Sequence, residues 1–498
     1  MKKQTMVTFF IMIFSSVLIP THSNCGAEEL YLRQGPTTAA TSDSKISSTE
    51  NIFRLQRSSQ FRTPAELRNQ VDFWKKIFTS VSNHQAVIHD KRAMGVIYET
   101  VELTENESKD KKMRAFAVSP VLRKYKAILE RLDAMPPYEL ERLTGEDKRV
   151  YDLLYSNGIR SGYKDAADRL RVQVGQSDRF KKALSRSTLY LKNMEEVFAE
   201  RGLPTELTRL PFVESAFDIN AYSWANAAGL WQFTRYTAKK YVKINKVVDE
   251  RLDPIKSTTA ASKLLAFNYE QLHSWPLAIT AYNHGCYGMQ RAVERTATTD
   301  ICYIVDNYDG PAFGFASRNF YTELLAVLEI LDEYDKYFSD VVFQHPENYD
   351  TLTLTRAIKL NHLIAGTSVT VDDIQRLNPE LLNPVLDSKL PLPKYYTLKI
   401  PQGAKEHLIS SLDSDLQSAD RNSDGVDLTE RKSVTEKPVK ISQDAAPTYK
   451  RHVIQKGQTL YAISRLYNIT VNDIMKINDL KSPESIKAGQ VIKIPAAT

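Results

Sequence analysis

Residues 202–217 read Gly-Leu-Pro-Thr-Glu-Leu-Thr-Arg-Leu-Pro-Phe-Val-Glu-Ser-Ala-Phe, and this stretch decides the fold. Its apolar side chains recur at the spacing of one helix face, as in Leu207, Leu210, Val213 and Phe217. Glu214 lies at the edge of this apolar stripe. Loss of water there raises the pKa of a carboxyl group, which then stays protonated as a general acid near neutral pH. The stretch therefore predicts a buried helix with a candidate acid, although a lone Glu on a helix is ordinarily solvated.

Two further motifs follow in the same helical region, and they supply polar groups of a suitable kind. They are Gly229-Leu230-Trp231-Gln232 and Ala281-Tyr282-Asn283-His284-Gly285. Gln232, Tyr282 and Asn283 are neutral hydrogen-bonding groups that suit hydroxyl and acetamido substituents, while Trp231 offers a flat apolar face. The glycines permit turns and close backbone approach. Each motif alone is weak, because a Trp or Tyr at helical spacing is more often part of a core.

A second carboxylate is the usual partner of such an acid, since ordinary glycosidases use two at a set separation. Asp218 follows Glu214 by four residues and would share its face of a continuous helix. We expect Asp218 to cap the helix end or to bind locally instead. The two downstream motifs contain no Asp or Glu. The pattern favours a mechanism with a single acid.

Together, in this order and spacing, the three motifs resemble the lytic transglycosylase domain of the goose-type-lysozyme-like superfamily. The resemblance extends upstream through residues 172–176, 186–187, 190–191 and 202–207. With the C-terminal module described below, the pattern resembles the type D membrane-bound lytic murein transglycosylases over about two thirds of the chain.

The resemblance implies a reaction and a role for each matching residue. Glu214 would protonate the glycosidic oxygen between N-acetylmuramic acid and N-acetylglucosamine. It would then draw the proton from the muramoyl 6-hydroxyl, whose attack gives a 1,6-anhydro product without water. The substrate would be held by Ser215, Gln232, Tyr282 and Asn283.

The sequence departs from the family pattern after the third motif. The family usually has Glu-Thr-Arg-x-Tyr there, and this chain has Ala316-Ser317-Arg318-Asn319-Phe320. The family tyrosine hydroxyl, which lies near the acid, would be missing at Phe320 unless Tyr321 replaces it. This departure does not change the expected fold, but the missing hydroxyl is expected to lower the rate of cleavage.

An internal repeat marks two small modules near the C-terminus. Residues 370–378 recur as 470–478, and residues 398–401 recur as 492–495. The second copy predicts a strand, two helices and a strand, and His452 to Pro495 resembles a LysM domain. That resemblance implies binding to glycans that contain N-acetylglucosamine, with Gly457, Gln458, Thr459 and Leu460 as the expected contact residues. The first copy lacks this turn and looks degenerate, which puts its sugar binding in doubt.

The length of 498 residues exceeds what one core usually organises. We expect a multidomain protein, with an all-α lysozyme-like catalytic domain and a helical N-terminal extension, followed by small α+β modules of βααβ order. The predicted segments are a signal peptide at 1–27, the helical extension at 42–165, the lytic transglycosylase domain at 166–335, a degenerate LysM-like module at 345–412, a flexible linker at 413–448 and a LysM domain at 450–496.

The N-terminus predicts export. Lys2 and Lys3 precede an uncharged, mostly apolar run of 13 residues from Val7 to Ile19. This run is shorter than the roughly 20 residues of a membrane-spanning helix and is typical of a signal peptide. Cleavage after residue 27 competes with lipidation of Cys25 and with an uncleaved anchor. We expect a protein of the bacterial periplasm or cell envelope, whose membrane association would run through the N-terminus only.

Composition and motifs exclude several other classes. A formal charge of +6 spread over 66 basic and 60 acidic residues does not indicate a nucleic-acid-binding protein. The sequence has no CxxC, HExxH or clustered Cys/His pattern, so we expect no metal and no cofactor. In an oxidising compartment Cys286 and Cys302 form either a disulfide or two free thiols.

The leading hypothesis is a peptidoglycan lytic transglycosylase whose partner is the glycan strand and whose LysM domain tethers it there. Two alternatives stay open at this point. One is a non-catalytic peptidoglycan-binding scaffold in which Phe320 marks a decayed site. The other is a hydrolytic muramidase that uses the same Glu214 with water as the nucleophile.

Overall fold

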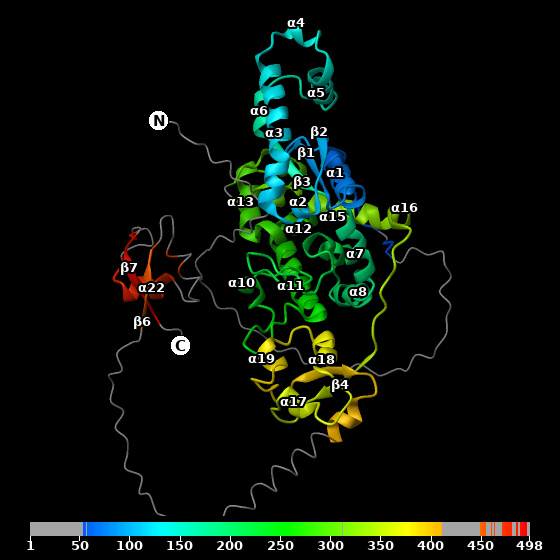
Figure 1. Cartoon of the computed structure of the whole chain (residues 1–498), viewed down its shortest axis with the longest axis vertical. Helices are drawn as coiled ribbons and strands as arrows, with labels where there is room; N and C mark the ends of the chain where they lie inside the picture. The colour runs from blue at the N-terminus through cyan, green and yellow to red at the C-terminus, as the bar shows by residue number, and fades with distance from the viewer. Residues whose placement is uncertain are drawn as a thin grey trace, which may run out of the picture. The chain divides into compact units, whose positions relative to one another are not determined.

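The computed structural model describes residues 53–410 except 56 and 311, together with residues 449–454, 460, 463, 471–480, 485–486 and 489–495. The chain divides into two compact units, Met1–Asn422 and Ser423–Thr498 (Figure 1). The predicted signal segment with Cys25 and the predicted linker at 413–448 lie outside the described residues. Among the helices that the structure describes, none is long and apolar enough to cross a bilayer.

A small antiparallel sheet lies near the start of the first unit. It has the strand order β2-β1-β3, with β1 at Gln85–Asp90, β2 at Ile97–Glu102 and β3 at Leu170–Val174. The helices around it are η1 (Ser59–Phe61), η2 (Ala65–Leu67), α1 (Arg68–Thr79), α2 (Glu105–Lys109), α3 (Lys111–Ala134), α4 (Pro137–Leu140), α5 (Gly145–Ser156) and α6 (Tyr163–Asp168). One face of the sheet and the helices α3, α5 and α6 share a hydrophobic core.

The predicted helical extension at 42–165 therefore omitted two strands, β1 and β2. Ala86, Val87 and Ile88 of β1 are all fully buried, so this strand has cores on both of its faces. A strand buried on both faces is a continuous apolar run without alternation, and such a run cannot be told from a buried helix by its periodicity.

The rest of the first unit up to residue 338 is helical, as the predicted all-α lysozyme-like fold requires. Its helices are α7 (Ser177–Ser187), α8 (Leu191–Ala199), η3 (Thr205–Arg209), α9 (Leu210–Glu214), α10 (Arg235–Ala238), α11 (Pro254–Leu272), α12 (Trp275–His284), α13 (Cys286–Thr296), α14 (Ile301–Asn307), α15 (Phe315–Asp332) and α16 (Tyr334–Phe338). Local chemistry sets their ends. The Asp253 side chain caps the first turn of α11, and Gly285, at φ 88°, separates α12 from α13.

The N-terminal segment belongs to the core of this helical region. One hydrophobic cluster runs from Phe53 to Phe338 and includes residues from both sides of position 165. Helix α1 packs against α15, where the indole Nε1 of Trp74 donates to Oδ1 of Asn319 at 2.9 Å. The buried helix α15 is thus covered by α1, which precedes it by more than two hundred residues in the sequence.

Both repeat copies have an antiparallel strand pair with helices between the strands, but the first copy has three short helices where two were predicted. In the first, β4 (Tyr349–Thr353) pairs antiparallel with β5 (Thr397–Pro401), and α17 (Leu360–Leu363), α18 (Val371–Leu377) and α19 (Asn383–Leu386) lie between them. In the second, β6 (Tyr449–Val453) pairs antiparallel with β7 (Val491–Pro495), and α22 (Val471–Ile477) lies between them. The first copy lies at the opposite end of the first unit from the β1–β2–β3 sheet (Figure 1).

One asparagine in each copy makes the same hydrogen bonds, which explains part of the repeat. Asn378 Nδ2 donates to the carbonyl oxygens of Ile374 at 2.8 Å and Lys399 at 2.7 Å, and its Oδ1 accepts from the Lys399 amide at 2.8 Å. Asn478 repeats this pattern with Ile474 at 2.8 Å and with both backbone groups of Lys493 at 2.6 Å. The side chain therefore fastens the end of a helix to the closing strand in both modules.

Candidate active site

Glu214 is the last residue of the short helix α9. Ser215 follows it, and then Ala216 and Phe217 both adopt left-handed backbone conformations with φ 53°. Two successive non-glycine residues in this region are unusual and costly, so the surrounding packing must hold the turn. The helix consequently ends at the acid, which lies at a turn rather than along a continuous helix face.

Asp218 makes local contacts and does not share a helix face with Glu214. Because the helix ends, the spacing of four residues no longer places the two carboxylates on one face. The Asp218 carboxylate accepts from the Asn220 amide at 3.0 Å and lies 3.7 Å from the Arg186 guanidinium. This local binding agrees with the expectation from the sequence.

The surroundings of Glu214 favour its neutral form. Burial, together with the negative charge of Glu323, raises the pKa of Glu214 well above its ordinary value, while the Arg179 guanidinium acts in the opposite direction. The Oε1 atom of Glu214 is buried and has no hydrogen-bond partner among the described residues. A protonated carboxyl with an unpartnered oxygen is suited to donate its proton to a bound ligand.

Ser215 is buried and makes a hydrogen bond within the protein. It is 1% exposed, and its hydroxyl donates to the Leu230 carbonyl oxygen at 2.9 Å. The sequence interpretation placed Ser215 on the substrate. Through its bond to Leu230 the hydroxyl joins the end of the first motif to the turn of the second, and its contact with substrate stays a prediction.

Gln232 lies in that turn with a left-handed backbone at φ 44°. Its Nε2 donates to the carbonyl oxygens of Gly229 at 2.9 Å and Ala221 at 3.1 Å. The neighbouring Trp231 is fully buried, stacks on Phe198 and belongs to the core rather than to a ligand platform. The amide nitrogen of Gln232 therefore stabilises its own loop and presents the rest of the side chain in a fixed orientation.

Tyr282 and Asn283 come from the end of helix α12 and complete the cluster. The Tyr282 hydroxyl donates to the Trp231 carbonyl oxygen at 2.8 Å, and Oδ1 of Asn283 accepts from the Ser317 hydroxyl at 2.8 Å. Burial and then the charge of Glu214 raise the pKa of Tyr282 well above its ordinary value. Direct contacts and electrostatic proximity thus bring the three motifs together around Glu214.

Phe320 and Tyr321 lie where the sequence departs from the family pattern, and their contacts show whether Tyr321 can replace the missing tyrosine. The Phe320 ring stacks on Tyr282 with centroids 6.2 Å apart and planes 3° apart. The Tyr321 hydroxyl donates to the Gln60 carbonyl oxygen at 2.7 Å. Tyr321 thus lies on another face of α15 than Phe320. Tyr321 therefore does not replace the missing tyrosine, because consecutive helix positions point about 100° apart.

Glu323 is a residue that the sequence interpretation missed. It lies on α15, three positions after Phe320, and is 2% exposed. Burial raises the pKa of Glu323 to about 8, the charge of Arg171 on β3 opposes this shift, and its Oε1 has no partner among the described residues. The available signal was a single acid inside the mostly apolar sequence of residues 320–328. A second carboxyl therefore does influence Glu214, from a helix outside the three motifs.

Other predicted sites are placed as follows. Cys286 and Cys302 are both free thiols, which decides between the two alternatives. Within the described part of the chain, no group of three or more His, Cys, Asp or Glu side chains is arranged to hold a metal ion. Gly457, Gln458 and Thr459 lie outside the described residues. Leu460 is fully buried in the core of its module, so its side chain packs there and is not available to a glycan.

Family comparisons identify two domains. Residues 194–304 match the transglycosylase SLT domain, and residues 452–495 match the LysM domain. Over 347 residues the chain is 25% identical to membrane-bound lytic murein transglycosylase D of Escherichia coli strain K12, covering 66% of this chain and 70% of that protein. Over 46 residues it is 44% identical to the cortical fragment-lytic enzyme of Bacillus subtilis strain 168, covering 9% of this chain and 11% of that protein.

Two solved structures are also similar at low level. The 70 kDa soluble lytic transglycosylase of Escherichia coli is 14% identical with a TM-score of 0.27, covering 55% of this chain and 52% of that chain. An inactive mutant of the lytic transglycosylase Slt of Pseudomonas aeruginosa is 20% identical with a TM-score of 0.25, covering 40% of this chain and 32% of that chain. The resemblance to lytic transglycosylases with a LysM domain is confirmed by the domain and relative matches, and these structural scores add no detail of the site.

Proposed function

We propose that this chain, which carries a transglycosylase SLT domain and a LysM domain, is a peptidoglycan lytic transglycosylase. The bond cleaved is the β-1,4 link between N-acetylmuramic acid and N-acetylglucosamine. One observation carries the proposal: the unpartnered carboxyl of Glu214, with its pKa held above the ordinary range, lies where the three motifs meet. A neutral carboxyl is the form that a general acid needs.

The reaction uses Glu214 twice. The carboxyl gives its proton to the glycosidic oxygen as the bond from that oxygen to the muramoyl anomeric carbon breaks. The resulting carboxylate then takes the proton of the muramoyl 6-hydroxyl as its oxygen bonds to the anomeric carbon. The acid is regenerated, no water enters, and the product ends in a 1,6-anhydro ring.

The surrounding residues divide into ligand-holding and positioning groups. Gln232, Tyr282 and Asn283, from the second and third motifs, are proposed to hold the sugar, including its acetamido group. The contact of Ser215 with the Leu230 carbonyl oxygen supports a positioning role. Because Phe320 contributes no hydroxyl, the developing charge has one donor fewer than in the usual family pattern.

The LysM domain is proposed to tether the enzyme to glycan strands in the bacterial cell envelope. The export-type N-terminus and the relation to a membrane-bound murein transglycosylase support this location. A weak binder joined to a catalytic unit raises the effective concentration of the enzyme at a polymer with many sites.

The decisive experiment is mass spectrometry of the soluble fragments released from purified peptidoglycan. Glycan ends about 18 Da lighter than hydrolysis products are expected, which is the loss of one water by simple mass balance. Glu214→Gln should abolish release, and Glu294→Gln, which changes an exposed acid on α13, should leave it unchanged. Ends of full mass would make the protein a muramidase. Absence of fragments from the unaltered chain would leave the binding scaffold.

A further inference from the structure

The turn that carries Gln232 rests on a buried arginine. Arg251 is 3% exposed, and its Nη1 donates to the carbonyl oxygens of Asn226 at 2.6 Å and Phe233 at 3.0 Å. These two oxygens flank the Gly229–Gln232 turn in the sequence. The approach is close, because a Cβ on Gly229 would lie 2.0 Å from the Arg251 carbonyl oxygen. The position of Gln232 therefore depends on the position of Arg251.

Arg251 is in turn oriented by Asp249. The guanidinium Nε and Nη2 bond the two carboxylate oxygens of Asp249 at 2.9 Å and 2.6 Å. Asp249 is itself 3% exposed. Two parallel charge-assisted hydrogen bonds in a buried setting fix the plane of the guanidinium. The remaining Nη1 is thereby directed at the turn.

The segment that carries Asp249 is bound to the first LysM-like module, residues 345–412. The Asp249 amide donates to the Glu380 carbonyl oxygen at 2.8 Å, and the Leu382 amide donates to the Val247 carbonyl oxygen at 3.0 Å. Val248 forms an isolated antiparallel bridge with Leu381, and its side chain belongs to the hydrophobic core of the module. Residues 247–249 are thus paired by backbone hydrogen bonds with residues 380–382, which lie between α18 and α19 of the module.

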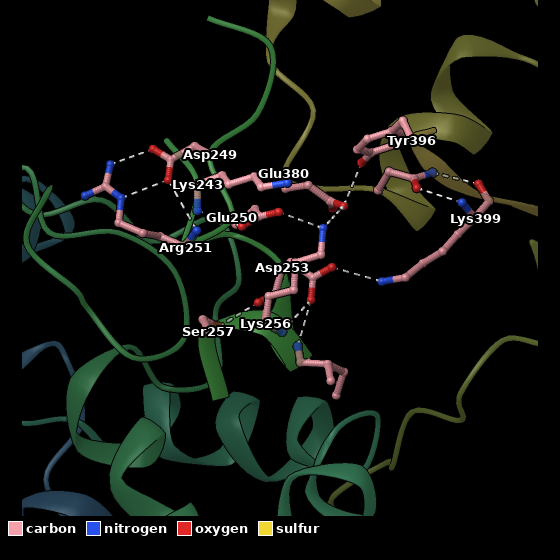
Figure 2. Close-up of polar contacts among 12 residues, drawn as sticks. Lys243, Asp249, Glu250, Arg251, Asp253, Lys256, Ser257, Glu380, Tyr396 and Lys399 are labelled. Carbon is pink, nitrogen blue, oxygen red and sulfur yellow. Dashed lines mark hydrogen bonds and ion pairs between the residues drawn. The ribbon is translucent and has the colours of Figure 1, made fainter. Parts of the chain in front are cut away.

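Charged side chains strengthen the same contact, as Figure 2 shows. Lys399 of the module lies 3.2 Å from the buried carboxylate of Asp253, and Lys256 of α11 lies 3.4 Å from the buried carboxylate of Glu380. The Tyr396 hydroxyl donates to the same Glu380 carboxylate at 2.8 Å. Breaking a pair that includes a buried charge is costly, so the two surfaces are held firmly together.

We propose that the first LysM-like module is a brace for the active site, in which Asp249 and Arg251 are positioning residues for the Gly229–Gln232 turn. The module then acts on catalysis through the protein and needs no sugar of its own. This accounts for a copy that has lost the glycan-contact turn of the second module while keeping its Asn378 bonds and its core. The activity readout rests on the proposed function, whereas the structural readout does not.

The test loosens the contact from the surface. In the full chain, Lys256→Ala and Lys399→Ala are combined, because both side chains are partly exposed and neither lies at Glu214. Hydrogen–deuterium exchange is measured for the amides of residues 226–233 and 247–249. Both segments should exchange several-fold faster, since local opening governs exchange. The kcat for glycan cleavage should fall about tenfold with KM little changed, as expected for a misplaced group. Lys389→Ala, on an exposed pair of the same module, is the matched control and should change neither.

Each other result has a stated meaning. Faster exchange at 247–249 with unchanged exchange at 226–233 would overturn the brace, because the contact would open without moving the turn. If exchange is unchanged in both segments, it is measured again in Arg251→Lys. Unchanged exchange at 226–233 in that variant would also overturn the brace. A loss of peptidoglycan binding with unaltered kcat would assign the module to sugar binding instead. Failure of the unaltered chain to cleave glycan would reject the proposed function and leave the exchange test of the brace valid.

Discussion

The chemistry proposed for Glu214 depends on its immediate neighbours. Glu323 from α15, Arg179 from α7 and Tyr282 from α12 are the groups that interact with it electrostatically. Burial is the largest influence, and the Glu323 charge adds to it. A carboxyl that is neutral near pH 7 can donate a proton, and the buried carboxylate that it leaves regains one readily.

Replacing Glu323 should move the pH dependence of cleavage. Glu323 gains its negative charge only as the pH rises through its pKa of about 8, and this charge then keeps Glu214 protonated to higher pH. Glu323→Gln removes the charge, so the alkaline limb of the kcat/KM profile should shift to lower pH by about one unit. The profile is measured from the rate of anhydro-product release. Glu294→Gln, an exposed acid, should keep the profile of the unaltered chain. An alkaline limb that does not move would show that Glu323 leaves the protonation of Glu214 untouched.

The same substitution should change how stability depends on pH. The pKa of Glu323 is about 8 in the folded chain and 4.5 as its ordinary value. The stability from its protonated form is therefore fully present below about pH 4.5 and is lost as the pH rises through about 8. Glu323→Gln should flatten the fall of the melting temperature between pH 5 and 9 by several degrees, measured by thermal unfolding. Parallel curves for the two proteins would contradict this.

At the scale of elements, sequence patterns predicted the helical core and the paired small modules. They failed where long-range packing decides. The segment Ala86–Ile88 within β1 looks like any buried apolar run, and the bond of Ser215 to Leu230 cannot be seen in the sequence because it forms only when the turn is folded. Glu323 was missed because nothing in local sequence reports that α15 passes beside Glu214. The contact between residues 247–249 and 380–382 likewise joins segments far apart in the chain.

The helix-to-strand fastening by Asn378 makes a prediction for the first module. Asn378→Ala removes three hydrogen bonds and leaves backbone groups of Lys399 without their partner. The cost should be about 2–4 kcal/mol of local stability. Exchange of the Lys399 amide in the full chain measures it. The exposed Asn361→Ala on α17 serves as the control, and equal exchange in both variants would remove Asn378 from this role.

At the scale of the whole molecule, the two modules of the repeat are proposed to have separate tasks. The first belongs to the same compact unit as the catalytic helices, and the second lies in the other unit. Similar sequences can therefore serve as a brace in one place and as a tether in another. This division follows from contacts of the first copy that the repeat pattern itself does not contain.

Removing residues 450–498 should separate tethering from chemistry. Binding to insoluble peptidoglycan should weaken about tenfold or more, because the effective concentration at the polymer is lost. Cleavage of short soluble glycans should change less than about twofold. Co-sedimentation and product release measure the two effects. An equal loss of peptidoglycan binding and of short-glycan cleavage would mean that the LysM domain contributes to the catalytic step.

The packing of α1 against α15 also dictates an order of events in folding. Trp74 and its partner Asn319 are 245 positions apart, so the core around Glu214 closes only after most of the first unit has been made. During synthesis the N-terminal segment is made first, and its apolar face stays uncovered until α15 follows. Such long-range closure is slow in proportion to its sequence separation. A chain that still lacks α15 therefore has no closed core around Glu214.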